Sequence, residues 1–213
     1  MSQKVVIVGG VAGGATAAAR LRRLSEETQI ILIERGSDIS YANCGLPYYV
    51  GDVIKSREAL FVQTPKTMRD KFNIDVRTLQ EVTQIDRDAK IVTVRNLQTE
   101  ETYTETYDIL VLSTGSTPLR PPIPGIDGER LLTLWNVVDT DRIKEAIEKW
   151  NVKTVTVVGG GFIGLEMAEN LHGLGIQVTL VEMLDQVMAP LDFEMAQLLH
   201  ENLWQNGVDL RLG

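Results

Sequence analysis

Cysteine and histidine are nearly absent from the sequence. Its 213 residues include one cysteine, Cys44, and two histidines, His172 and His200. A single thiol excludes a disulfide within the chain, and so few thiols and imidazoles exclude the usual zinc ligand sets. We therefore expect no metal centre. Both histidines fall on segments with helical periodicity, where we expect them to be surface or packing residues.

Long apolar runs and an excess of positive charge are also missing. No segment approaches the roughly 20 apolar residues that a membrane-spanning helix needs. The 21 Lys plus Arg against 29 Asp plus Glu give a net charge of −8, whereas a nucleic-acid partner needs a basic surface. The apolar stretch 5–19 could be a short signal peptide, but four glycines interrupt it. We expect a cytoplasmic protein with neither a membrane nor a nucleic acid as partner.

Glycine is present in two groups, and the second forms a complete G-x-G-x-x-G motif at residues 159–164. It lies between a predicted strand at 152–158 and a predicted helix at 162–174. In such motifs the glycines allow a tight turn, a close approach to a pyrophosphate and helix–strand packing. Glu182 ends the next predicted strand, where a carboxylate accepts hydrogen bonds from ribose hydroxyls. Since a carboxylate repels a 2′-phosphate, NADH is favoured, and NADPH stays possible.

The first glycine group, residues 9–14, is less regular because Val11 replaces the middle glycine of the motif. It follows a predicted strand at 4–8 and opens a predicted helix at 13–24. Glu34 ends the next predicted strand, as Glu182 does in the second unit. Two such units about 150 residues apart predict two dinucleotide sites.

The single cysteine lies in Ser-Tyr-Ala-Asn-Cys-Gly-Leu-Pro-Tyr-Tyr, residues 40–49. Pro47 is suited to the first turn of a helix, which places Cys44 just ahead of helix amides and favours a reactive thiolate. A buried and inert cysteine is the alternative. Tyr49 occupies the position where a dithiol reductase has its second cysteine. Cys44 must therefore cycle as a sulfenic acid, a persulfide or a mixed disulfide with an external thiol.

Together, the tandem motifs, the Ser-Thr-Gly turn at 113–115 and the Asn-Cys-Gly-Leu-Pro-Tyr segment resemble one group of enzymes. These are the coenzyme A-disulfide reductases and NADH-dependent persulfide reductases, the single-cysteine branch of the flavin-disulfide reductases. The resemblance implies FAD in the first fold, NADH in the second, and coenzyme A as substrate or product.

The resemblance also implies site residues, position by position. It implies a catalytic Cys44 and a coenzyme A site formed by Thr16, Arg20, Arg23, Ser40, Asn43 and Lys71. The implied FAD positions are Gly9, Gly10, Ala12, Gly13, Gly14, Glu34, Arg35, Val82, Ser113, Thr114 and Gly115. The implied NAD positions are Gly159, Gly160, Gly161, Phe162, Ile163, Gly164, Glu166 and Glu182.

Several of these positions have a plainer interpretation. Arg20 and Arg23 share one helical face and could form a solvated basic patch. In this family an aromatic gate over the nicotinamide pocket falls at Phe162, and the helix turn nearest the flavin falls at Glu166. Either residue could simply serve packing or helix charge.

We expect an α/β protein with two tandem Rossmann-like folds, FAD first and NAD second, and an antiparallel β-meander at residues 76–107. The expected boundaries are 1–118 for the FAD domain with the cysteine loop, 119–138 for a Pro/Gly-rich linker, and 139–213 for the NAD domain. The resemblance implies a second FAD segment and a dimerisation domain past Gly213, so we expect a truncated chain that is a homodimer at full length. The alternatives are an NADH oxidase or peroxidase that cycles through a sulfenic acid, and a nucleotide-binding fragment without turnover.

Overall fold

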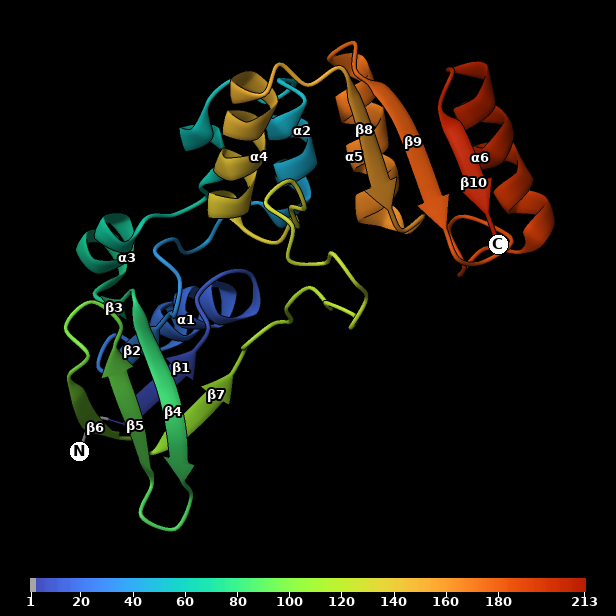
Figure 1. Cartoon of the computed structure of the whole chain (residues 1–213). Helices are drawn as coiled ribbons and strands as arrows, with labels where there is room; N and C mark the ends of the chain where they lie inside the picture. Colours follow the sequence, from blue (N-terminus) through green and yellow to red (C-terminus); the bar gives the residue numbers. More distant parts are fainter. Residues whose placement is uncertain (1–2) are drawn as a thin grey trace. The chain divides into compact units, whose positions relative to one another are not determined.

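The computed structural model describes residues 3–213, which form two compact units (Figure 1). The first unit contains the chain up to Ala42 and the segment Phe61–Thr117. The second contains Asn43–Leu60 and Pro118–Gly213. The observed packing thus differs from the expected boundaries at residues 43–60, the segment that carries Cys44. The assignment of one nucleotide domain to FAD and the other to NAD stays a prediction.

The first unit is built on a four-stranded parallel sheet of order β3-β2-β1-β7. These strands are β1 (Lys4–Val8), β2 (Gln29–Ile33), β3 (Asp75–Arg77) and β7 (Ile109–Leu112). Helices α1 (Gly13–Leu24) and α3 (Pro65–Phe72) pack on one face, with Ala15, Ala18 and Met68 in the same core as Ile7 and Leu32. Burial on both faces explains why β1 and β2 are continuous apolar runs.

The predicted meander covers the other face of this sheet. It consists of β4 (Gln80–Asp86), β5 (Ile91–Asn96) and β6 (Thr102–Thr106), paired antiparallel in that order. Val92 and Val94 of β5 are fully buried against Val6 and Ile31 of the parallel sheet. The expected combination of a Rossmann-like unit with an antiparallel meander is confirmed.

The second unit repeats the first pattern with a three-stranded parallel sheet of order β10-β9-β8. Its strands are β8 (Thr154–Val158), β9 (Gln177–Glu182) and β10 (Asp209–Leu212). Its helices are α2 (Leu46–Val50), α4 (Val137–Lys149), α5 (Phe162–Gly173) and α6 (Phe193–Gln205), with the short 3-10 turns Asn43–Gly45 and Arg57–Leu60. Val50 of α2 and Ile143 of α4 share a core with Val178 and Leu180 of β9. This shared core explains why the cysteine segment packs in the second unit.

Within residues 3–213, the described helices are all too short or too polar to cross a membrane. The same residues contain no group of three His, Cys, Asp or Glu side chains that could hold a metal ion.

Candidate functional site

The turn after β8 holds the complete glycine motif, and its glycines meet different demands. Gly159 has a φ of +105°, which side chains rarely allow. A Cβ placed on Gly164 would lie 1.9 Å from the carbonyl oxygen of Gly159, so the first turn of helix α5 requires glycine at position 164. Gly161 is unlike both, because its φ is −80° and an added Cβ would have no described atom within 4 Å apart from those of the adjacent residues. The fold does not need glycine at 161, so the open space at the start of α5 is available to a ligand.

Glu182 ends β9 and is held by two backbone amides. Gly160 N–H donates to its Oε2 at 2.7 Å and Leu184 N–H donates to its Oε1 at 2.9 Å. The hydrogen bond from Gly160 is the largest cause of a pKa lowered below the usual carboxyl value, and the bond from Leu184 adds to it. Glu182 is therefore ionised near neutral pH. Its oxygens keep lone pairs that can accept ribose hydroxyls.

The turn after β1 has the same construction. Gly9 has a φ of +96°, and a Cβ on Gly14 would lie 1.7 Å from the Gly9 carbonyl oxygen. Gly10 N–H donates to Oε2 of Glu34 at 2.7 Å, and Gly36 N–H donates to Oε1 of the same carboxylate at 2.7 Å. The glycine motif and the distant glutamate are therefore brought together in this unit also.

The turn after β7 lies directly beside the first glycine motif. Ser113 N–H donates to the Val8 carbonyl at 2.7 Å, which continues the pairing of β7 with β1. A Cβ on Gly9 would lie 2.1 Å from the Ser113 carbonyl oxygen, and one on Gly13 would lie 3.1 Å from Ser113 Oγ. The Ser-Thr-Gly turn thus closes around the start of α1, where Thr114 and Gly115 are exposed.

Three other predicted FAD positions, Ala12, Arg35 and Val82, lie in the same unit as this motif. Ala12 is exposed at the N-cap of α1, and Val82 of β4 packs against the core shared by the sheet and the meander. Arg35 follows Glu34, is half exposed, and pairs with Glu81 at 3.6 Å. These contacts account for Arg35 and Val82 without a ligand, so their binding role stays a prediction.

The cysteine segment begins at Ser40, which lies against the first motif with a left-handed φ of +47°. Its N–H donates to the Gly10 carbonyl at 2.9 Å, and its carbonyl accepts from Val62 N–H at 2.8 Å. Cys44 follows in the 3-10 turn Asn43–Gly45 and is exposed, so the alternative of a buried cysteine does not hold. Pro47 lies in the first turn of α2, as predicted.

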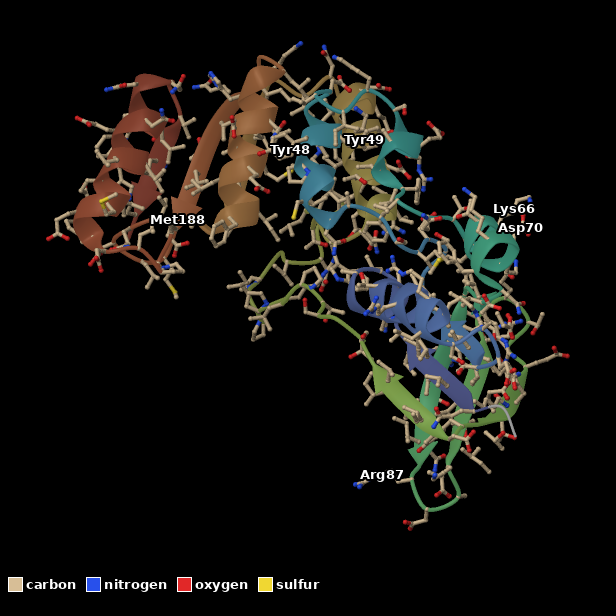
Figure 2. All side chains as sticks on the ribbon, turned by 180° about the vertical axis from the view of Figure 1, so that it is seen from behind. Tyr48, Tyr49, Lys66, Asp70, Arg87 and Met188 are labelled. Carbon is tan, nitrogen blue, oxygen red and sulfur yellow. The ribbon has the colours of Figure 1, made fainter. Side chains whose placement is uncertain are left out.

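Contacts with α4 and α5 hold the residues that follow Cys44. Lys144 Nζ donates to Asp52 Oδ1 at 2.5 Å and to the Tyr49 carbonyl at 3.1 Å. The same ammonium lies 4.8 Å from the centre of the Tyr49 ring, in a cation–π contact. Figure 2 labels Tyr48 and Tyr49 on α2, beside α4. Tyr49 therefore anchors α2 at the position that a second cysteine would occupy in a dithiol reductase.

A second ion pair and one close packing contact complete this attachment. Arg57 Nε donates to Asp141 Oδ2 at 2.9 Å, so α4 offers one charge of each sign to the segment. Gly51 packs against the buried Asn170 of α5, because an added Cβ would lie 2.4 Å from Asn170 Oδ1. Sequence reasoning missed these residues, since their partners are distant in the chain.

The predicted coenzyme A residues divide between the two units. Thr16, Arg20 and Arg23 are exposed on α1, and Lys71 is exposed in the last turn of α3. Asn43 precedes Cys44 in the second unit, where it is exposed.

Arg22, which lies between the two arginines of this set, has a structural role. Its guanidinium donates to the carbonyls of Phe72 at 2.7 Å, Thr28 at 2.8 Å and Asn73 at 2.9 Å. These bonds fix the end of α1 and leave the basic side chains at 20 and 23 facing outward.

The remaining NAD positions lie in the first turns of α5. Phe162 and Ile163 are exposed, at 66% and 58% of their full accessible surface. Glu166 is half-buried, and its carbonyl accepts from Asn170 Nδ2 at 2.8 Å. Large apolar side chains left exposed next to an open glycine turn are suited to cover a flat ligand.

Known proteins share this arrangement along the whole chain. The family model for pyridine nucleotide-disulphide oxidoreductases matches residues 3–213. A coenzyme A disulfide reductase from Staphylococcus haemolyticus (strain JCSC1435) is 38% identical over 210 residues, which are 99% of this chain and 47% of that protein. The chain thus spans about half the length of the curated relatives it matches.

Solved structures agree. The crystal structure of reduced Bacillus anthracis CoADR-RHD has 55% sequence identity to this chain and a TM-score of 0.97. The match covers 100% of this chain and 38% of the Bacillus anthracis chain. An NAD-dependent persulfide reductase from A. fulgidus is 38% identical, with a TM-score of 0.93 over 98% of this chain and 39% of its own. The resemblance predicted from the glycine motifs and the cysteine segment is confirmed. The chain belongs to the pyridine nucleotide-disulphide oxidoreductase family.

Proposed function

We propose that this chain provides the two nucleotide sites and the reactive thiol of an FAD-dependent enzyme that reduces a coenzyme A disulfide or persulfide with NADH. The observation that carries the proposal is the contact between a motif amide and a distant glutamate, made once by Gly10 and Glu34 and again by Gly160 and Glu182. Two such turns on one chain supply two dinucleotide sites. The exposed Cys44 on the same chain supplies the thiol that reacts with the disulfide.

The residues of the first unit fit the nucleotide half of FAD. The start of α1 offers backbone N–H groups to the pyrophosphate, and Glu34 is positioned to accept from the adenosine ribose. Ser113, Thr114 and Gly115 close the turn beside them. The chemistry that FAD supplies when bound is the transfer of two electrons from NADH to a sulfur atom.

The residues of the second unit fit NADH better than NADPH. Glu182 keeps its negative charge because two amides hold its oxygens, and a 2′-phosphate would meet that charge. The next side chains are Met183 and Leu184, both exposed and apolar, so they offer a phosphate no positive charge. The 84% exposure of Met183 leaves it free to cover the adenosine end of the ligand.

Cys44 performs thiol–disulfide exchange. Its thiolate attacks one sulfur of the disulfide, the S–S bond breaks, and the first coenzyme A leaves as a thiolate. Two electrons that originate from NADH then break the mixed disulfide, which releases the second coenzyme A and restores the Cys44 thiolate. The sum is NADH, one proton and one disulfide converted to NAD⁺ and two thiols. Because the chain has one cysteine, the intermediate must join Cys44 to the substrate.

A direct test is the intact mass of the protein after incubation with coenzyme A disulfide, recorded before and after dithiothreitol. We expect one added coenzyme A, removed by dithiothreitol and absent in Cys44→Ser. An added oxygen in place of coenzyme A, formed with peroxide, would support the oxidase or peroxidase alternative. A thiol that stays unmodified in folded protein would support a nucleotide-binding fragment.

The basic face of α1 can be tested in the same assay. Replacing Arg20 and Arg23 with alanine is expected to slow labelling of Cys44 by coenzyme A disulfide, because the phosphates lose their partners. Bis(2-hydroxyethyl) disulfide carries no charge and serves as the matched control, since its labelling rate should not change. Equal rates with coenzyme A disulfide in both proteins would make the arginines a solvated surface patch.

A further inference from the structure

His200 is the most deeply buried ionisable side chain of the second unit, with 1% of its surface exposed. It lies on α6, and its Nε2 accepts a hydrogen bond from the backbone N–H of Val187 at 3.1 Å. The sequence predicted only a surface or packing role for this histidine. An imidazole that accepts from a buried amide has a defined protonation state, because Nε2 must carry no proton.

The amide that His200 holds belongs to the turn that supports the second glycine motif. Val187 is fully buried and packs on Gly160, where a Cβ would lie 2.8 Å from Val187 Cγ1. The next residue, Met188, donates its N–H to the Gly160 carbonyl at 2.8 Å. Figure 2 labels Met188 in this turn, near the carboxyl end of β9.

The Val187–Met188 turn is strained. Met188 has a φ of +51°, in the left-handed region that is unfavourable for a non-glycine residue. Such a conformation persists only where surrounding bonds hold it. Val187 donates to His200 and Met188 donates to Gly160, while the Met188 carbonyl accepts from Leu191 N–H at 2.8 Å. Gly160 in turn donates to Glu182 at 2.7 Å, so the bonds to His200 and Gly160 connect the turn to the glycine motif.

We propose that His200 is a positioning residue for the NADH site: its unprotonated Nε2 holds the Val187–Met188 turn, and the turn fixes Gly160 and Glu182 for the dinucleotide. This inference rests on the proposed function of the second unit. Deleting the acceptor leaves a buried N–H unpaired and releases a strained turn directly under the glycine motif. Protonating Nε2 has the same effect, because two donors then face each other.

Burial lowers the pKa of His200 below that of an ordinary histidine, and no charge contributes to that shift. The ionisable groups of the surrounding segments are all half-buried or exposed. They are Glu182 on β9, Asp185 and Asp192 in the connection to α6, Glu194 and Glu201 on α6, and Asp209 and Arg211 on β10. A histidine with a lowered pKa is neutral at pH 7 and gains its proton only in more acidic solution. NADH binding should therefore weaken only in solution more acidic than the pKa of an ordinary histidine.

The test measures NADH dissociation constants by fluorescence titration of the purified chain and two variants. His200→Leu removes the acceptor and keeps an apolar side chain, so we expect NADH to bind about tenfold more weakly, as an unpaired buried amide implies. His200→Gln can present a carbonyl oxygen to the same amide and should restore most of the affinity. Leu203→Ala, a core substitution on the same helix, should lower the melting temperature without changing NADH affinity.

FAD affinity is the internal control, because the first motif lies in the other unit and should be unaffected. Equal NADH affinity in wild type and His200→Leu would overturn the inference. A chain that binds no NADH at any pH would overturn the proposed function of the second unit and this inference with it.

If His200→Leu does not fold, a pH series with wild type and His200→Gln tests the inference instead. Wild type should lose NADH affinity as the pH falls below the range in which an ordinary histidine titrates, while His200→Gln, which has no imidazole, should give a flat profile. Parallel profiles in these two proteins would contradict the assignment.

Discussion

The two nucleotide units hold their glycine motifs with the same set of contacts. In the first, Ile39 packs on Gly10, and Ser40, at a φ of +47°, donates to the Gly10 carbonyl at 2.9 Å. In the second, Val187 packs on Gly160, and Met188, at a φ of +51°, donates to the Gly160 carbonyl at 2.8 Å. Each motif amide then donates to a glutamate at 2.7 Å. The two turns thus share one geometry, although Ser40 in the first unit corresponds to Met188 in the second.

The two units differ in the segments that follow these turns. After the first turn the chain leads to Cys44 and passes into the second unit, where Lys144 and Asn170 hold it. After the second turn the chain leads to α6, which carries His200. The middle motif position is half-buried Val11 in the first unit and exposed Gly161 in the second. The backbone of the second unit is therefore more open at this position than that of the first.

The largest expected effect comes from the last glycine of each motif. Gly14→Ala and Gly164→Ala would each place a Cβ within 2 Å of a backbone carbonyl oxygen, at 1.7 Å and 1.9 Å. A backbone carbonyl cannot move away from the new methyl group as a flexible side chain could. We therefore expect each change to destabilise its unit by about 3 kcal/mol. Thermal melting should show a drop of about 6 °C or more.

Gly173→Ala is the matched control for these two variants. It lies in the last turn of α5, and beyond its own helix and the adjacent residues no described atom lies within 4 Å of an added Cβ. It should melt as wild type or slightly higher, because alanine suits a helix better than glycine. Melting of Gly14→Ala and Gly164→Ala at the wild-type temperature would contradict the shared construction of the two turns.

The middle motif position should separate ligand binding from folding. Gly161→Ala has free space around the new methyl group, so the melting temperature should stay close to that of wild type. NADH should bind about tenfold more weakly, equivalent to about 1.4 kcal/mol, because the methyl group occupies the pyrophosphate approach. Val11→Ala is the corresponding control in the first unit and should leave NADH affinity unchanged. Unchanged NADH affinity in Gly161→Ala would place the ligand elsewhere.

The smallest expected effect concerns Glu182 and pH. Its pKa is lowered from 4.5 by the amides of Gly160 and Leu184, so the folded state favours the charged form. A group with a lowered folded pKa stabilises the protein above its unfolded value, and that stabilisation is lost as the pH falls through the folded pKa. Denaturant unfolding should therefore show Glu182→Gln less stable than wild type by about 1 kcal/mol at pH 7. The difference in free energy of unfolding should shrink below about pH 4.5. A difference that stays constant down to about pH 3 would contradict a role for the charge of Glu182.

Much of the fold follows from local sequence. Buried β-branched runs predicted the parallel strands, and the two glycine motifs predicted where α1 and α5 begin. The predicted helix 139–150 begins earlier in the structure, at Val137, because the Asn136 side chain accepts from Asp139 N–H at 2.9 Å and caps the helix there. Such a cap is a local signal that the helical period alone does not contain.

Non-local contacts account for what the sequence did not predict. The cysteine segment was expected to pack with the first domain, but its ion pair from Asp52 to Lys144 spans 92 residues and joins it to the second unit. The role of His200 depends equally on a backbone amide 13 residues away, which no motif marks. The glycine and glutamate positions were predictable because a glycine motif between a strand and a helix, and an acid at the end of the next strand, are both visible in the local sequence.

The most direct test of the account is a crossed binding measurement with FAD and NADH titrated separately into wild type, Glu34→Ala and Glu182→Ala. Each carboxylate holds one motif amide and is proposed to accept the ribose hydroxyls of one dinucleotide. We predict that Glu34→Ala loses affinity for FAD and keeps NADH, while Glu182→Ala loses NADH and keeps FAD. If both variants lose the same ligand, or neither loses any, the two turns are not two separate dinucleotide sites.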